Sequence, residues 1–313
     1  MANGGPAPGG PAIAVLGSAN MDLVAYVPVA PRRGETVTGR DFRTVPGGKG
    51  TNQAIAAALA GGRVAMIGAV GDDAFGPRLR EALAGRSVDT DGLRTVPGPS
   101  GTAHIVVDDQ GGNSIVVVPG ANATVTALTP DDERRIAAAG ALLLQLELPM
   151  AGVLAGAEAA GAHGVPTLLT PAPAVPLPDG LLARTDVLLP NEHEAAALTG
   201  HRDPHRAGRA LLDVVPEVVI TLGAAGSLYF ARGAEPVTVP AAPVRAVDTT
   251  AAGDTFAGAL AVARGEGRPM AAALAWATAA AALSVQRTGA TSSMPARAEI
   301  DTAARRSGPA LSR

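Results

Sequence analysis

One short segment near the C-terminal end of the chain, 247–256, has residue types that could transfer a phosphoryl group. Its carboxylates, Asp248 and Asp254, lie six positions apart, and an Ala-Ala-Gly turn directly precedes the second. The segment runs into a helical pattern, which leaves the N–H groups of the turn free at the positive end of a helix dipole, where anions bind. A carboxylate beside such a site is suited to take a proton from a hydroxyl group that attacks a phosphate. We therefore predict that Asp254 is a catalytic base.

A glycine-rich segment at 47–53 is a second candidate site, although it is not a P-loop. Arg43 stands where that motif needs its first glycine, and Gly50 follows Lys49 where the motif needs Ser or Thr. Two interpretations stay open. The segment either forms a glycine turn that begins a helix, or it brings its backbone close to a small polar ligand.

Asn20 and Asp22 follow the apolar run Ile13–Leu16, which predicts a buried strand. Ligands of open α/β sheets bind beyond the carboxyl ends of the strands, and an Asn and an Asp two positions apart can share the hydroxyl groups of a sugar between them. The alternative is a turn that ends the strand and uses both side chains for backbone hydrogen bonds.

A further polar segment, 190–194, follows an expected strand and begins an expected helix. Asn191 at the N-cap and acidic residues in the first turn are typical of helix capping, which fully explains Glu192. Asn191 and Glu194 could also reach a phosphate-bound Mg²⁺ ion or its water molecules.

The composition excludes several classes of protein. The net charge is −3 and no block of basic residues stands out, which argues against a nucleic-acid-binding protein. The absence of cysteine rules out disulfides, thiolate metal sites and a cysteine nucleophile, and it fits a reducing compartment.

The sequence also predicts where the protein resides. The longest nearly uncharged run, 270–285, is shorter than the ~20 residues that a membrane-spanning helix needs, so we expect a buried helix there. The start of the chain, 1–11, lacks the features of a signal peptide and predicts a disordered leader, as 304–313 predicts a disordered tail. We expect a cytoplasmic protein without a membrane partner.

Alternating strand and helix patterns predict a parallel sheet with helices on both faces, which is an α/β fold in three layers. The expected strands are Ile13–Leu16, Val64–Val70, Ala141–Leu146, Thr167–Thr170, Val187–Leu189 and Val218–Leu222. The expected helices are Asn52–Ala60, Ala74–Ala84, Met150–Ala162, Glu192–Leu198, His205–Leu212 and Ala257–Arg264. Two regions, about 23–45 and 100–120, interrupt this rhythm and predict antiparallel strands of a small lid outside the main sheet. No linker divides the chain, so we expect one domain, 1–313.

Taken together, these segments resemble the ribokinase family of sugar kinases, also called the PfkB family, from about Ile13 to Ile300. Two motifs are specific to that family: Gly47-Gly48-Lys49-Gly50-Thr51-Asn52-Gln53-Ala54 and Asp248-Thr249-Thr250-Ala251-Ala252-Gly253-Asp254-Thr255-Phe256. The resemblance implies a three-layer α/β/α sandwich with a β-sheet lid. It also implies transfer of phosphate from ATP to the 5-hydroxyl group of D-ribose.

The resemblance assigns a role to each matching residue. The sugar would be bound by Asn20, Asp22, Gly48, Lys49, Asn52 and Glu147, with Asp254 as the base and the N–H groups of Ala252 and Gly253 as the anion hole. ATP would contact Asn191, Thr221, Gly223, Gly226, Gly253 and Thr278. Glu194 would hold the hydration shell of Mg²⁺, and a K⁺ site would be formed, mostly by backbone carbonyls, from Asp248, Thr250, Ser284, Arg287, Gly289 and Ser293.

The chain departs from the family pattern at two positions, both expected on the nucleotide side. Thr170 stands where members typically have Asn, and Thr278 stands where they often have His. The sugar-side residues are intact, and Asn20 fits a substrate with a 2-hydroxyl group, which favours ribose over deoxyribose.

Two other functions stay open. One is a sister kinase that acts on deoxyribose, fructose or another small sugar. The other is a sugar-sensing protein without catalysis, which would have no need of a base at Asp254. The exposed edges of a β lid would be covered by pairing with a second copy, so the resemblance also implies a homodimer.

Overall fold

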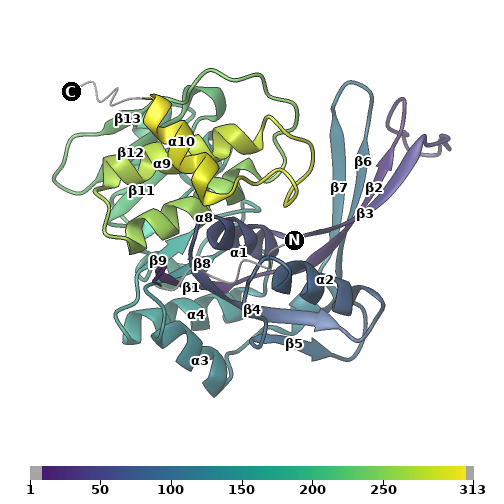
Figure 1. The fold of residues 1–313 in the computed structure, drawn as a ribbon, viewed down its shortest axis with the longest axis horizontal. Helices are drawn as coiled ribbons and strands as arrows, with labels where there is room; N and C mark the ends of the chain where they lie inside the picture. Colours follow the sequence, from purple (N-terminus) through teal and green to yellow (C-terminus); the bar gives the residue numbers. More distant parts are fainter. Residues whose placement is uncertain (1–8, 308–313) are drawn as a thin grey trace.

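A nine-stranded sheet forms the middle layer of the computed structural model, which describes residues 9–307 (Figure 1). In spatial order its strands are β13 (Val237–Val239), β12 (Ser227–Ala231), β11 (Glu217–Thr221), β10 (Val187–Leu188), β9 (Thr167–Leu169), β8 (Ala141–Leu144), β1 (Ala12–Leu16), β4 (Arg63–Gly71) and β5 (Leu93–Val96). The strands from β11 to β5 are parallel, and β12 pairs antiparallel with both of its neighbours. The predicted parallel sheet is confirmed.

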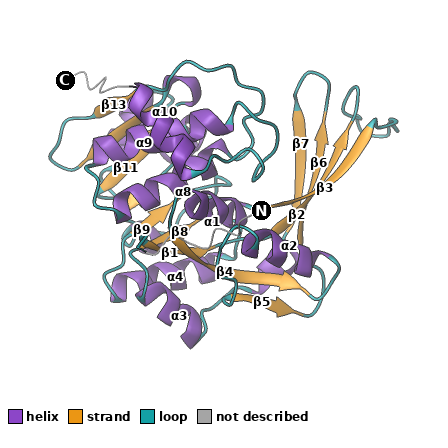
Figure 2. Ribbon diagram, in the orientation of Figure 1, coloured by secondary structure: helices purple, strands orange, loops and turns teal. Residues whose placement is uncertain are grey.

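Helices cover both faces of this sheet (Figure 2). They are α1 (Lys49–Leu59), α2 (Phe75–Ala84), α3 (Pro130–Ala137), α4 (Met150–Ala162), α5 (Asp179–Leu182), α6 (Glu192–Thr199), α7 (Pro204–Leu211), α8 (Ala252–Gly265), α9 (Met270–Ser284) and α10 (Arg297–Ser307), with short 3₁₀ turns at Gly120–Thr124 and Gly223–Ala225. The side chains of β1 alternate between two cores, because successive residues of a strand face opposite sides. Ile13 and Val15 belong to a core that includes residues of α1, α8 and α9, whereas Ala14 and Leu16 belong to one that includes residues of α3, α4 and α7.

Helices α1 and α8 lie unusually close together, because Gly258 of α8 faces α1. A Cβ atom at this glycine would lie 2.7 Å from the Cβ of Ala56 and 2.7 Å from the backbone nitrogen of Ala57. A side chain at 258 would therefore push the helices apart. The close approach lets the first turns of the two helices share one site.

A separate four-stranded sheet projects from one end of the main body (Figure 1). Its order is β3 (Asp41–Gly47), β2 (Asn20–Tyr26), β6 (Gly101–Val107) and β7 (Asn113–Val118), so it lies in the two regions expected to form a lid. The expectation of purely antiparallel strands is wrong, because β2 and β6 are parallel. Both leave the same carboxyl edge of the main sheet, after β1 and β5, and therefore run in the same direction.

The two ends of the described chain are more ordered than the sequence predicts. Helix α10 continues to Ser307, so 304–307 are helical rather than part of a disordered tail. At the other end, the carbonyls of Gly10 and Pro11 accept hydrogen bonds from Arg63. The remainder of both predicted tails, 1–8 and 308–313, lies outside the described residues. Within 9–307 no helix has both the length and the apolar composition that crossing a membrane requires.

Candidate active site

Asp254 is the third residue of α8 and is buried, with 6% of its surface exposed. Asn52 Nδ2 donates to its Oδ2 atom, and Gln53 Nε2 donates to its Oδ1 atom, each over 3.1 Å. Both partners are neutral amides on α1, so the carboxylate is held by uncharged donors rather than by a cation. Burial raises the pKa of Asp254, while the charge of Lys49 and the two amide bonds lower it.

The turn before Asp254 has the geometry of an anion site. Ala251 adopts a left-handed conformation with φ of 58°, which is uncommon for a residue other than glycine and is typical of functional turns. The N–H group of Ala252 makes a long bond of 3.3 Å to Thr249 O, and the N–H group of Gly253 lies at the second helical position, where no carbonyl precedes it within the helix. Gly253 also borders open space.

Two adjoining cavities meet at this turn. The smaller, of about 180 Å³, is lined by Asp254, Lys49, Glu194, Asn191 and Thr170 among others. The larger, of about 530 Å³, is lined mainly by small and apolar residues between 221 and 285, including Thr221, Gly223, Gly226 and Thr278. Both cavities share Ala252, Gly253 and Phe256. The residues expected to contact ATP therefore lie together, with Asn191 at the smaller cavity.

Thr278 fits the position expected of it. Its side chain is buried, its hydroxyl oxygen has no hydrogen-bond partner within the described residues, and it lines the larger cavity. Thr170 differs from the expectation, because its hydroxyl accepts a hydrogen bond over 3.1 Å from Gln53, which also donates to the carboxylate of Asp254.

The sugar-side residues meet at the carboxylate of Glu147. Its Oε2 atom accepts hydrogen bonds from the backbone N–H of Lys49 over 3.0 Å, from the hydroxyl of Ser18 over 2.5 Å and from Asn20 Nδ2 over 3.5 Å. Asn20 Oδ1 in turn accepts from Asn122 Nδ2 over 2.8 Å. Asn20 and Asp22 belong to β2, so the interpretation of these residues as a strand-ending turn is wrong.

Asp22 lies against the glycine segment. A Cβ atom on Gly47 would approach Asp22 Oδ2 to 2.2 Å, and Gly48, with φ of 90°, would place a Cβ 2.8 Å from the backbone nitrogen of Asn20. The interpretation of the segment as a glycine turn that begins a helix is confirmed, since α1 starts at Lys49. Close approach of its backbone to a ligand stays a prediction. Burial, together with the charges of Glu147 and Asp254, raises the pKa of Asp22 to about 7.

Lys49 is the only lysine in the chain, and it lies among these acidic groups. Burial opposes the charge of its ammonium group, but Asp254, Glu147 and Glu194 outweigh that effect and raise its pKa. The chain otherwise uses arginine for its basic residues. An ammonium group is a compact point charge, which a planar guanidinium group would not reproduce.

Asn191 and Glu194 form a capping box at the start of α6. The side chain of Asn191 accepts from Glu194 N, and Glu194 Oε2 accepts from Asn191 N, each over 2.8 Å. The capping interpretation is thus confirmed. Both residues also line the smaller cavity, and burial raises the pKa of Glu194 against the opposing effects of Asn191 N–H and Lys49.

The residues expected to bind K⁺ lie in the loop before α8 and in the segment from Ser284, the last residue of α9, to Ser293, and Asp248 holds the two together. Its carboxylate accepts from the N–H groups of Thr250 and Gly289, over 2.9 and 2.8 Å. The other side chains are engaged elsewhere: Arg287 pairs with Glu299, Ser284 donates to Ala281 O and Ser293 donates to Ala290 O. Their backbone carbonyls are the expected ligands. Among the described residues, no three His, Cys, Asp or Glu side chains cluster as a metal site.

Sequence reasoning missed several residues that the structure brings to the site. Gln53 stands within the Gly47–Ala54 motif, and Ser18 and Gln145 lie two positions before Asn20 and Glu147, so their polar character was a usable signal. Asn122 was not detectable, since it lies in a 3₁₀ turn far along the chain and only the fold brings it to Asn20.

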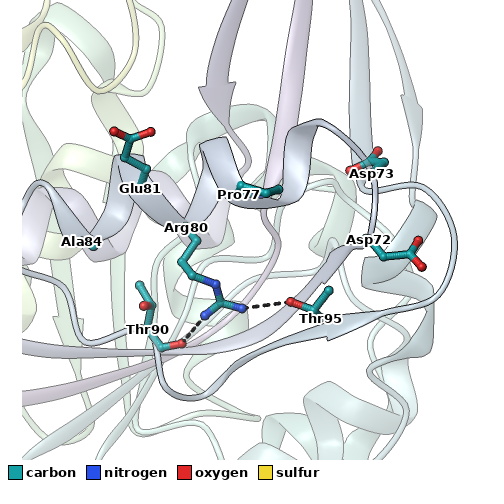
Figure 3. Close-up of a pocket in the computed structure, with 9 residues that line it drawn as sticks. Asp72, Asp73, Pro77, Arg80, Glu81, Ala84, Thr90 and Thr95 are labelled. Carbon is teal, nitrogen blue, oxygen red and sulfur yellow. Dashed lines mark hydrogen bonds between the residues drawn. The ribbon is translucent and has the colours of Figure 1, made fainter.

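A further cavity, of about 510 Å³, lies beside α2 and contains none of these residues (Figure 3). The guanidinium group of Arg80 donates to Thr90 O, Leu93 O and Thr95 Oγ1. These hydrogen bonds connect α2 to β5, so the role of Arg80 is structural.

Comparison with known proteins assigns the class. Residues 11–297 match the family described as pfkB family carbohydrate kinase, and the chain belongs to this family. The chain is 41% identical to the ribokinase of Schizosaccharomyces pombe, over 92% of this chain and 96% of that protein, and 44% identical to the ribokinase of Bacillus subtilis, over 92% and 98%. A structure of Arabidopsis thaliana ribokinase complexed with ribose and ATP superposes with a TM-score of 0.89, at 36% identity over 95% of this chain and 99% of that one. The resemblance seen in the sequence is confirmed, and the protein is a carbohydrate kinase.

Proposed function

We propose that this kinase transfers the γ-phosphoryl group of ATP to the 5-hydroxyl group of D-ribose, giving D-ribose 5-phosphate and ADP. The observation that carries the proposal is the place of Asp254, which lies between two amide donors where a small polar cavity meets a larger apolar one. A sugar beside Lys49 and a nucleotide in the larger cavity would present their reacting atoms to the same carboxylate. The ribokinase relatives support ribose as the sugar.

Each residue then has a defined task in the reaction. Asp254 takes the proton of the 5-hydroxyl as its oxygen forms a bond to the γ-phosphorus, and the bond from that phosphorus to the β–γ bridging oxygen breaks. The N–H groups at the start of α8, from Ala252 and Gly253, stabilise the negative charge of the transferring group. The remaining hydroxyls are held by Asn20, Asp22, Gly48, Lys49, Asn52 and Glu147.

Two cations complete the proposal. Glu194 lines the cavity with a carboxylate, the kind of ligand that Mg²⁺ and its water molecules prefer, and bound Mg²⁺ would neutralise charge on the phosphates. Carbonyl oxygens of the loops that Asp248 joins suit K⁺, which would stiffen the turn before Asp254. The backbone N–H groups of Val247 and Asp248 both donate to Val285 O, which joins the two segments a second time, and the first segment continues directly into Ala252 and Gly253.

The substrate is tested by measuring ADP release with ribose, deoxyribose and fructose, each with potassium and with sodium. We expect the highest kcat/KM with ribose and faster turnover in potassium. Faster turnover of deoxyribose or fructose would identify a sister kinase. Ribose binding without ADP release from any sugar would point to the sensing function instead.

The small sheet also supports a homodimer. Edge strand β7 exposes Ile115 and Val116, with 52% and 64% of their surfaces accessible, next to Val117 and Val118, and the opposite edge strand β3 exposes Phe42, with 62% accessible. An apolar edge strand tends to pair with another chain. We propose that two copies pair through this sheet.

Light scattering tests the dimer. The wild type is expected to have twice the mass of the chain, and a Val116→Lys, Val118→Lys double variant is expected to be a monomer, because buried ammonium groups would face each other across the interface. Val214→Lys, at an exposed valine in the loop after α7, is the matched control and should remain dimeric. A monomeric wild type would contradict the proposal.

A further inference from the structure

A chain of buried amides leads from the main sheet to the catalytic carboxylate. Gln53 and Gln145 are both fully buried. Gln53 Nε2 donates to Asp254 Oδ1 and to Thr170 Oγ1, each over 3.1 Å, and Gln145 Nε2 donates to Gln53 Oε1 over 2.7 Å. Every polar atom of the Gln53 side chain is therefore engaged.

The carboxylate of Asp254 determines which way the amide groups of Gln53 and Gln145 are turned. An ionised carboxylate can only accept hydrogen bonds, so Gln53 must turn its NH₂ group toward Asp254. Its carbonyl oxygen then faces Gln145, which must present an NH₂ group in turn. The oxygen of Gln145 is left without a hydrogen-bond partner in the described part of the chain.

The far end of the series of amides packs against the carboxyl end of β1 in the main sheet. Gln145 directly follows β8, and a Cβ atom on Gly17, just after β1, would lie 2.1 Å from Gln145 Oε1. The amide of Gln145 thus fills the space that a side chain at 17 would take. This contact anchors Gln145 and, through it, the rotation of the Gln53 amide.

We propose that Gln53 and Gln145 are positioning residues for phosphoryl transfer: Gln145 sets the direction of the Gln53 amide, and Gln53 holds Asp254 ionised and oriented toward the attacking hydroxyl. This inference rests on the proposed function for its chemistry but not for the identity of the sugar. The hydroxyl group of Thr170 contributes to this arrangement, because it accepts a hydrogen bond from the second N–H of the Gln53 amide.

The consequence is a change in the pH dependence of the reaction. The positive charge of Lys49 lowers the pKa of Asp254. The negative charges of Asp22, Glu147 and Glu194 also act on the carboxylate of Asp254. Loss of the Gln53 bond removes a donor to the ionised form, so the pKa of Asp254 rises and its active, ionised form appears only at higher pH.

The experiment records kcat against pH for the full-length wild type, Gln53→Leu, Gln145→Leu and the double variant. We expect the acid limb of Gln53→Leu to move up by about one pH unit, which at a pH within that limb is roughly a tenfold loss of rate. Gln145→Leu touches neither Asp254 nor the expected ligands, yet its acid limb should move in the same direction. The double variant should match Gln53→Leu, because Gln145 acts only through Gln53.

Gln110→Leu, an exposed glutamine in the turn between β6 and β7, is the matched control and should leave the profile unchanged. Thermal unfolding of each variant checks the fold, and Gln145→Leu carries the test alone if Gln53→Leu is unfolded. A lower kcat with an unmoved acid limb, or additive shifts in the double variant, would overturn the inference. If ribose is not the substrate, the wild type itself will be inactive on ribose, which distinguishes that outcome from the two results above. The pH profiles would then be recorded with the sugar that the wild type phosphorylates.

Discussion

Replacement of Asp254 by Asn is expected to lower kcat by about 100- to 10,000-fold, because a positioned general base contributes this much to the rate. An amide cannot take the proton of the attacking hydroxyl at neutral pH. ATP binding should persist, since the anion site uses backbone N–H groups. Coupled measurement of ADP formation gives kcat, and calorimetric titration with ATP gives the affinity.

The fold should survive Asp254→Asn for a structural reason. The new amide offers one acceptor to two donors, but Asn52 Oδ1 has no partner among the described residues and can accept from it if the Asn52 amide rotates. Asp213→Asn, at an exposed position after α7, is the control. Turnover of Asp254→Asn near the wild-type rate would remove Asp254 from the mechanism.

Replacement of Lys49 by Met is expected to lower kcat/KM by roughly 100- to 1,000-fold, the range found when one electrostatic contact to a reacting group is lost. The variant removes the cation from a site that holds Asp22, Glu147, Glu194 and Asp254. Lys49 lowers the pKa of Asp254, so its loss raises that pKa. The base is active when ionised, and the acid limb of the pH profile should therefore move to higher pH.

Lys49→Arg separates charge from shape in the same assay. It keeps the positive charge, so the acid limb should stay near that of the wild type, while the larger planar group should still weaken sugar binding and raise KM. An unchanged kcat/KM in Lys49→Met would show that neither sugar nor phosphate depends on this amine.

Much of the site was predictable because its residues carry strong local signals. Asp254 follows a turn of small residues that begins a helix. The glycines of the Gly47–Gln53 segment also predicted a turn in which the backbone approaches its neighbours closely. The alternation of strand and helix patterns likewise located α4, whose bounds agree with the prediction. What the sequence missed depends on long-range contact. The bond of Asn122 to Asn20 spans 102 positions, and the parallel pairing of β2 with β6 follows from where both strands leave the main sheet.

Short elements were missed for a different reason. Helix α3 buries only Asp132 and Ile136, so its apolar pattern is too sparse to detect, although a capping box from Thr129 to Asp132 marks its start. Strands β12 and β13 follow β11 without an intervening α-helix, so they fall outside the strand–helix alternation that located the parallel strands.

The single lysine gives this enzyme a built-in reporter. Reductive methylation with ¹³C-formaldehyde modifies primary amines, so besides the α-amino group it would place one labelled dimethylamine, at Lys49, within the cavity that Asp254 lines. The chemical shift of that signal would follow each proton gained or lost by the surrounding carboxylates. Nuclear magnetic resonance could thus observe the ionisation of the active site in the intact protein without mutation of any residue.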